Sequence, residues 1–405
     1  MIVKYYLLLL FILSRSVSAV TFKQAVKLIE NHESVKLLIN TSNILYEEAR
    51  VKGAWGDLNF KVNAKNFPVK TLSFNESPMT GVELSLAQKF PLSKKLSNFK
   101  DAYIAKSNSK KISSKQQQRS LKKILWQLSI SKEKINLDLI TYRKNLNWLK
   151  RMLKISKNLY SNGKIPQSAL LDIQIRISEV ETKFSNLRFE LKEIDKKLSY
   201  ILDGKELSLD LRSIPWKVLT YKGSNPKYDY EKKFHQKILE SRDFEMRAYD
   251  SNRIPDLTFS FGYTFRSKNW KEGDFVSAFI NFPLPTGSTR SASYKKAVYG
   301  KYEAKNILRN YEINKESNLG YLRESINKLK EELKILESKT LQFARSLRKI
   351  TSTSYGLGNS TYIELLDAEI KLLNILLREN KLNAHLKNLR LERKFVAGGK
   401  LDENI

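Results

Sequence analysis

The sequence contains no cysteine and very few histidines. Its 405 residues include 0 Cys and 3 His, together with 15 Gly and 9 Pro. The absence of Cys excludes a disulfide scaffold, a cysteine-ligated metal site and a lipid-anchored N-terminal Cys. His32, His235 and His385 are isolated, and the chain has no helical His pair, no Ser-His-Asp set and no phosphate-binding glycine loop. We therefore expect neither an enzyme nor a resident metal or other cofactor, although a metal ion as cargo stays open.

Long hydrophobic runs are also missing, apart from a short one at the N-terminus. Lys4 is followed by an apolar run from Tyr5 to Leu13 and then by Val17-Ser18-Ala19, whose small or compact residues suit signal peptidase. The run is shorter than the roughly 20 residues of a membrane-spanning helix, which disfavours an anchor. We expect residues 1–19 to be a cleaved secretory signal and Val20 to be the first mature residue. No other segment is apolar enough for a transmembrane helix, so any membrane passage has to use strands.

Acidic residues are scarce relative to basic ones. The chain has 73 Lys plus Arg against 42 Asp plus Glu, a net charge of +31. Between Leu92 and Tyr160 there are 18 basic residues against Asp101, Glu133 and Asp138, so 18 − 3 gives +15 in one segment. Such a surplus suits a polyanion partner, an anionic membrane surface or a cationic duct. Most of it is expected on the solvated side of a helix; the sharper alternative is a cationic lumen or outer belt that favours anionic cargo or lipid.

One stretch of the chain occurs twice. Tyr160 to Ile175 returns as Tyr355 to Ile370, 195 residues later. The matches are Tyr160 with Tyr355, Gly163 with Gly358, Leu170-Leu171-Asp172 with Leu365-Leu366-Asp367, and Gly204-Lys205 with Gly399-Lys400. The duplication predicts two halves of one architecture. We expect a first structural repeat at 20–205, a connector at 206–227, a second repeat at 228–399 and a short tail at 400–405.

The first repeat predicts a helix, a hairpin and two more helices. A helical pattern covers about 21–53, and residues Leu58 to Phe67 and Val82 to Phe90 then alternate between apolar and polar side chains, as amphipathic strands do. From Leu92 to Tyr160 there is no Gly or Pro, and apolar residues from Leu121 to Leu153 fall at heptad spacing, broken only at Lys132. Gly163 and Pro166 mark a turn, after which a return helix with its own seam stops at Gly204.

The second repeat predicts the same series. A helix at about 228–251 precedes a strand from Leu257 to Phe265 and another from Asp274 to Phe282. The motif Phe282-Pro283-Leu284 matches Phe90-Pro91-Leu92 of the first repeat. A long helix from about Ser288 to Tyr355 carries a heptad seam at Leu322, Ile326, Leu329, Leu333, Leu336, Phe343, Leu347 and Ile350. A last helix runs to about Lys394.

Each chain therefore offers four amphipathic strands of about ten residues, the length that crosses a bilayer. An open sheet leaves its edge amides without partners in lipid, so closure needs further copies. Two chains could just close a barrel of about eight strands, while three would supply about twelve and a lumen. A soluble sandwich edge for the strands and a fibrous coiled coil for the helices are the plainer alternatives. A periplasmic coiled-coil adaptor or tethering protein would have the helices without lipid-facing strands. A nucleic-acid-binding coiled coil fits the charge but contradicts the signal and the strands.

The order of elements, the Phe-Pro-Leu motifs and Tyr-Gly-Leu-Gly-Asn-Ser-Thr-Tyr-Ile-Glu-Leu-Leu-Asp-Ala at 355–368 resemble the TolC family of outer-membrane efflux proteins. The resemblance covers the whole mature chain. It implies a mainly α protein with membrane β: a homotrimeric α-barrel in the periplasm topped by a 12-stranded β-barrel in the outer membrane, with four strands per chain. It also implies a periplasmic adaptor and an inner-membrane pump or ABC exporter as partners, for efflux or type I secretion, and no nucleic acid.

The resemblance places both glycine turns at the periplasmic entrance. It implies adaptor docking at Asn162, Gly163, Lys164, Leu357, Gly358 and Asn359, and gating at Tyr355, Glu364, Asp367 and Asp172. Ser360 stands where related proteins often have a basic residue, so a Tyr-Arg-Asp latch is not expected. We hypothesise that Glu364 and Asp367 form an acidic ring that selects cations. Alternatively, Thr361 and Glu364 form a capping box, Asp172 and Asp367 interact with helix dipoles, and Tyr160 and Tyr355 pack.

Overall fold

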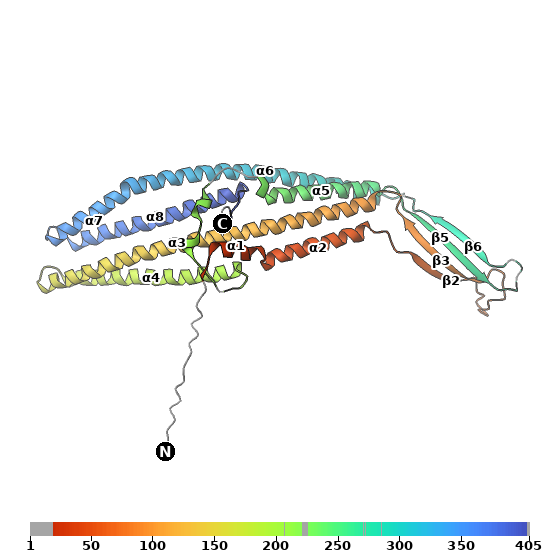
Figure 1. Ribbon diagram of the computed structural model, residues 1–405, viewed down its shortest axis with the longest axis horizontal. Helices are drawn as coiled ribbons and strands as arrows, with labels where there is room; N and C mark the ends of the chain where they lie inside the picture. The colour runs from red at the N-terminus through yellow and green to blue at the C-terminus, as the bar shows by residue number, and fades with distance from the viewer. Residues whose placement is uncertain are drawn as a thin grey trace, which may run out of the picture. The chain divides into compact units, whose positions relative to one another are not determined.

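The computed structural model describes residues 19–205, 207–220, 226–269, 271, 273–284 and 286–402. Apart from Ala19, the expected signal peptide lies outside these residues. The described chain is mainly helical, with one four-stranded antiparallel sheet (Figure 1). None of its helices combines the length and the apolar character needed to cross a membrane.

Two compact units make up the chain, and each takes segments from both repeats. The first unit comprises the residues up to 35, 117–229 and those from 315 onwards, and the second comprises 36–116 and 230–314. The long helices α3 (Lys95–Ser161) and α6 (Thr289–Ile335) run through both units. The duplication is therefore a repetition of elements and does not produce two separate compact domains.

The second unit contains the sheet. Its elements are most of α2 (Glu33–Gly53), β2 (Asn59–Lys65), β3 (Gly81–Phe90), α5 (Tyr230–Ser251), β5 (Leu257–Arg266), β6 (Phe275–Asn281) and the adjoining parts of α3 and α6. The strands are ordered β2-β3-β5-β6, and every neighbouring pair is antiparallel. The two central strands have the expected ten residues, whereas the two edge strands have seven. All four predicted strands are present, in a single sheet.

The first unit is built around paired helices. It contains β1 (Ala19–Val20), α1 (Phe22–Glu30), α4 (Gln167–Ile201), β4 (Ser208–Leu209), α7 (Leu341–Gly356), α8 (Tyr362–Val396) and the rest of α3 and α6. Short 3-10 turns η1 (Leu211–Ser213), η2 (Trp216–Leu219) and η3 (Pro226–Tyr228) lie in the connector. Val218 and Leu219 are buried in the same core as Trp126 and Phe22, whose ring centroids are 4.5 Å apart. The connector is therefore an integral part of this unit's core.

The single helix expected at 21–53 is in fact two helices. α1 ends at Glu30 and α2 begins at Glu33, with the buried His32 between them. Nδ1 of His32 accepts the backbone N–H of Ser34 at 3.1 Å, so the ring hydrogen lies on Nε2, which donates to the carbonyl of Tyr200 at 2.9 Å. The imidazole thus satisfies an amide at the start of α2, a group that a continuous helix would have bonded internally.

The seam of the second long helix changes face, contrary to expectation. Leu322 to Leu336 are buried as predicted, but Phe343 and Ile350 are 72% and 64% exposed, and Leu341 is 4% exposed. A π-helical segment, η4 (Leu336–Thr340), lies between the two stretches. Its wider turn adds a residue to the helical period, so the next buried positions are Leu341 and Ala344. An exposed apolar stripe is left on α7.

Lys132, which interrupts the seam of α3, has a structural explanation. Its ammonium group is 2.6 Å from Oδ1 of Asp195 on α4 and donates to the Ser208 hydroxyl of β4 at 3.1 Å. The buried charge is therefore paired and hydrogen-bonded, which such a position requires. Of the predicted seam residues on either side, Leu125, Ile135 and Leu149 are buried, whereas Leu128, Leu139, Tyr142, Leu146 and Leu153 are half-buried.

Candidate functional site

Both copies of the repeated turn have the same backbone geometry. Gly163 and Gly358 adopt φ values of +67° and +80°. In the first turn the N–H of Lys164 donates to the carbonyl of Leu159 and that of Gly163 to Tyr160; in the second, Asn359 donates to Ser354 and Gly358 to Tyr355. This is a Schellman motif, in which Gly suits the left-handed position. The predicted docking residues Asn162, Gly163, Lys164, Leu357, Gly358 and Asn359 are all exposed.

Glu364 lies in the capping box at the start of α8. Its N–H donates to the Thr361 hydroxyl at 3.2 Å, and its Oε2 accepts the Thr361 N–H at 3.1 Å. The Ser360 hydroxyl donates to the same oxygen, and together these bonds hold the pKa of Glu364 below its usual range. Glu364 therefore caps the N-terminus of α8, and its carboxylate keeps a negative charge at this turn.

Asp172 joins the two copies of the turn. Its Oδ2 accepts a hydrogen bond of 3.0 Å from the hydroxyl of Tyr362, which links the second turn of α4 to the first residue of α8. This bond raises the pKa of the Tyr362 phenol, because the nearby carboxylate favours its protonated form. The structure thus provides a polar link between the helix starts, made by Tyr362 and not by the predicted Tyr355.

The other two predicted gating residues have different environments. Tyr355 is buried in a cluster with Trp148, Ile173 and Leu365, and its hydroxyl is 3.4 Å from that of Ser156. Asp367 is exposed on α8, three residues after Glu364. Tyr355 therefore contributes packing to the helix ends, whereas Asp367 adds an exposed carboxylate.

Glu369, two residues after Asp367 on α8, is the centre of a polar cluster. Its carboxylate accepts from Nδ2 of Asn145 at 2.9 Å and from Nε of Arg348 at 3.0 Å. The Arg348 guanidinium lies 5.5 Å from the ring centre of Trp148, beside a cavity of about 370 Å³. The cluster connects α3, α7 and α8 behind the turns.

The register of the sheet gathers most of its apolar side chains on one face, while Phe275 and Phe279 of β6 lie on the other. Residues directly opposite each other in antiparallel strands share a face. One row joins Phe60, Leu86, Phe261 and Ala278, and the next joins Val62, Leu84, Tyr263 and Val276. The large side chains Phe60, Val62, Leu86, Phe259, Phe261, Tyr263, Phe265, Val276 and Ile280 are exposed on this apolar face. It lacks the cover that a soluble sheet needs, and it resembles the lipid side of a membrane strand.

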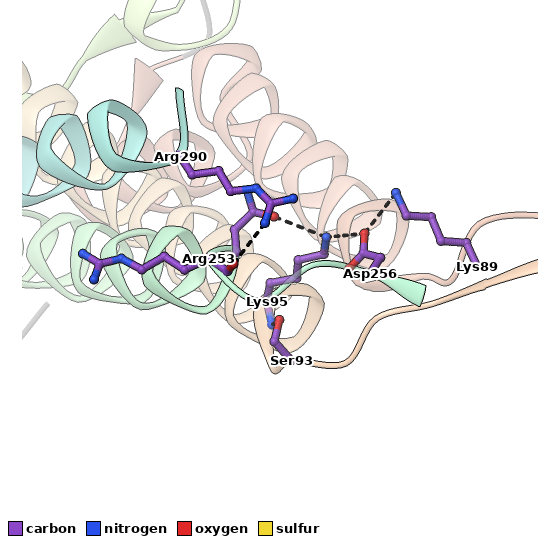
Figure 2. Close-up of polar contacts among 7 residues, drawn as sticks. Lys89, Ser93, Lys95, Arg253, Asp256 and Arg290 are labelled. Atoms are coloured by element: carbon purple, nitrogen blue, oxygen red, sulfur yellow. Dashed lines mark hydrogen bonds and ion pairs between the residues drawn. The ribbon is translucent and has the colours of Figure 1, made fainter. Parts of the chain in front are cut away.

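At the base of the sheet, basic side chains gather around one carboxylate (Figure 2). Asp256, just before β5, is 2.5 Å from the ammonium of Lys95 and 3.0 Å from that of Lys89. Nη1 of Arg290 donates to the carbonyl of Arg253 at 3.0 Å. Burial on its own raises the pKa of Asp256, but the hydrogen bonds and charges of Lys95 and Lys89 outweigh it and hold that pKa below the usual range.

Comparisons with solved structures match nearly the whole chain. The outer membrane protein VceC from Vibrio cholerae matches with a TM-score of 0.77 and 14% identity, over 94% of this chain and 97% of that chain. A membrane protein from Pseudomonas aeruginosa gives 0.78 and 12%, over 96% and 92%. The CmeC outer membrane channel from Campylobacter jejuni gives 0.72 and 13%, over 95% and 87%. The chain has the outer-membrane channel fold.

The TolC resemblance deduced from the repeated turns is thus confirmed for the fold. No family model matches the chain, and a search of curated proteins found no match. Across the part of the chain that the structure describes, no group of three or more His, Asp and Glu side chains is arranged to hold a metal ion.

Sequence reasoning missed Tyr362 and Glu369 as members of the site. Tyr362 is 190 residues from Asp172, and Glu369 is 224 residues from Asn145. The one available signal was the duplication itself, because it predicts two equivalent helix starts, one after each turn. Polar residues near both turns were therefore candidates for contacts between the copies.

Proposed function

We propose that this chain is one subunit of a homotrimeric exit duct in the outer membrane. The exposed apolar face of the sheet carries the proposal. The sheet has free edges at β2 and β6, and in lipid each edge amide needs a partner. Joining β6 of one copy to β2 of the next satisfies them, and three copies close a barrel of about twelve strands. The fold shared with outer-membrane channels supports the same arrangement.

The helices of one copy also leave apolar surface exposed. Phe343, Leu347 and Ile350 form the stripe on α7, and Leu171, Ile175 and Phe189 are exposed on α4. Stripes of this kind in a helical protein mark contacts with other chains. In the proposed trimer, neighbouring copies cover them and complete a helical barrel in the periplasm.

The repeated turns are the proposed entrance and adaptor-docking surface. Their six exposed residues are available to a periplasmic adaptor, which would connect the duct to an inner-membrane pump or an ABC exporter. Glu364 and Asp367 would supply the acidic ring, and the link between Tyr362 and Asp172 would hold the entrance closed. The channel itself is passive, serving efflux or type I secretion. A periplasmic coiled-coil adaptor or tether is disfavoured by the exposed apolar sheet.

Cysteine cross-linking tests the closure of the barrel directly. Asn59, Lys61 or Asn63 on β2 would be replaced by Cys together with Ser277 or Asn281 on β6, all on the polar face. Within one chain two strands separate these positions, about 14 Å, which exceeds the roughly 7 Å between Cα atoms that a disulfide spans. We expect at least one pair to give covalent dimers and trimers on non-reducing gels.

The native chain has no Cys, so no background disulfides arise. Single-Cys variants are the matched controls and should give no trimer. Protein recovered from the outer membrane without a covalent trimer from any pair would contradict the proposed closure. Recovery from the soluble periplasmic fraction would favour the adaptor or tether instead.

Tyr362→Phe should open the entrance. The substitution removes the hydroxyl that donates to Asp172 while keeping the aromatic ring, so α4 and α8 lose their link at the turns. We expect a several-fold increase in mean current through the purified channel in planar bilayers. Asp172→Asn should have a smaller effect, since an amide oxygen still accepts the bond.

Tyr160→Phe is the matched control. Tyr160 is also a tyrosine beside a turn, but its side chain is partly exposed and none of the described contacts involves its hydroxyl. Equal currents for wild type and Tyr362→Phe would show that the link is not part of the gate.

A further inference from the structure

The polar face of the sheet carries an uneven distribution of charge. Its ionisable side chains within the strands are Lys61, Lys65, Glu83, Lys89 and Arg266. Glu83 is the one carboxylate among these described strand residues, so four cations face one anion. In the proposed barrel this face surrounds the lumen, because the apolar face is turned toward lipid.

The carboxylates of this region are covered by lysines. Glu83 is 7% exposed and lies 2.7 Å from the ammonium of Lys65, which is 30% exposed. Gly262 makes room for it, since a Cβ there would come within 2.6 Å of Oε1 of Glu83. At the base of the sheet Asp256 is 7% exposed beneath Lys89, which is 60% exposed.

Lys61 and Lys89 therefore dominate the charge that water meets on this face. Lys61 is exposed in the middle of β2, and Lys89 is exposed near the end of β3. Arg266 contributes less, because it is buried with its guanidinium 4.3 Å from the ring centre of Phe275. In a trimer, Lys61 and Lys89 would each form a ring of three ammonium groups with no exposed carboxylate between them.

We propose that these two lysine rings make the barrel lumen selective for anions and favour anionic cargo. The inference rests on the proposed trimeric duct. Rings of basic side chains in a pore attract anions and repel cations, and the lumen side of a barrel is where substitutions tune selectivity. The barrel would thus select for anions and the acidic residues at the entrance for cations, and a permeating ion would pass both regions in turn.

The test is the reversal potential of purified channels in planar bilayers under a KCl gradient. Measurements use a channel that also carries Glu364→Gln and Asp367→Asn, so that the entrance carboxylates no longer contribute to the measured ion selectivity. We expect a preference for Cl⁻ in this background and a preference for K⁺ after adding Lys61→Glu and Lys89→Glu. Lys61→Gln with Lys89→Gln should lie between them, and Lys61→Arg with Lys89→Arg, the matched control, should keep the Cl⁻ preference.

The outcomes separate this inference from the proposed function. A wild-type protein that forms no channel would contradict the duct itself. Conducting channels that prefer K⁺ in the neutral-entrance background, or whose reversal potential is unchanged by the double charge reversal, would leave the duct in place and overturn the lysine rings. The conductance of each variant shows that it has folded and assembled.

Discussion

Phe261→Lys should prevent the chain from assembling in the outer membrane. Phe261 is exposed on the apolar face of the central strand β5, opposite Leu86 and Ala278. A lysine facing lipid near the middle of the bilayer costs about 2–4 kcal/mol, and a trimer contains three such positions, for a total of about 6–12 kcal/mol. This total is comparable to the whole stability of many folded proteins. We therefore expect gels of the outer-membrane fraction to show little or no trimer band, the band that dissociates when the sample is heated.

Ser260→Lys is the matched control for this substitution. Ser260 precedes Phe261 on the same strand, lies opposite Ala87 and Phe279, and belongs to the polar face. A lysine there enters the proposed water-filled lumen, so trimers should form at nearly the wild-type level. If Ser260→Lys blocks assembly while Phe261→Lys does not, the sheet turns its other face to lipid. If both assemble normally, the sheet does not lie in a membrane.

This contrast depends on alternation, the part of the fold that the sequence predicts best. Strands reveal which residues share a face, since neighbouring side chains point to opposite sides. Spacing alone therefore places Leu257, Phe259, Phe261, Tyr263 and Phe265 on one face of their strand. The pairing of β3 with β5 joins segments of different repeats, and local spacing carries no information about it.

Helix faces were predicted less completely, as α7 shows. Phe343, Leu347 and Ile350 continue the heptad spacing of Leu336, while Leu341 and Ala344 continue it after one added residue. Both stripes are apolar, so periodicity does not choose between them. The π-helical segment rotates the helix by one residue, and as a result Leu341 and Ala344 are buried in the core of the chain. The first stripe is thereby left exposed on α7.

The candidate site was predicted in its backbone and missed in its side-chain contacts. Gly163 and Gly358 determine the turns through their left-handed conformation, which is a local property that a sequence records. The capping box of Thr361 and Glu364 is local as well, and it was foreseen as an alternative. The bond between Tyr362 and Asp172 depends on how two distant helices pack, so it required the structure.

Arg119→Met should cause the largest loss of stability among the substitutions considered in the helical unit. Nη2 of Arg119 donates to three carbonyl oxygens at the end of α8: Phe395 at 2.6 Å, Gly399 at 3.1 Å and Lys394 at 3.3 Å. The Lys394 and Phe395 carbonyls also accept the backbone N–H groups of Gly399 and Gly398, as in a Schellman turn, and they carry the negative end of the helix dipole. Methionine keeps much of the side-chain volume and removes every donor.

The expected cost follows from what would stay buried. Arg119 is 7% exposed, so water has little access to the carbonyls it satisfies. A hydrogen bond to a charged group contributes about 1.5–3 kcal/mol, and the bonds to these carbonyls share one guanidinium nitrogen, so we expect a loss in the free energy of unfolding of about 3 kcal/mol. The chain beyond α8 should loosen first, because Leu401 and Asp402 dock beside Arg119 through Trp126 and Lys122.

Two measurements check this expectation. The guanidinium midpoint, followed by helical circular dichroism in detergent, should fall, and trypsin should cleave after the exposed Lys400 more rapidly. Arg119→Lys should recover part of the loss, since an ammonium keeps the charge without the planar fork of donors. Arg378→Met is the matched control: its ion pair with Glu332 lies at the surface, with the Arg378 side chain 59% exposed, and contributes about 0–1 kcal/mol. An unchanged midpoint and cleavage rate in Arg119→Met would mean that the end of α8 is held by the apolar contacts of Leu401 and Trp126, and not by the guanidinium.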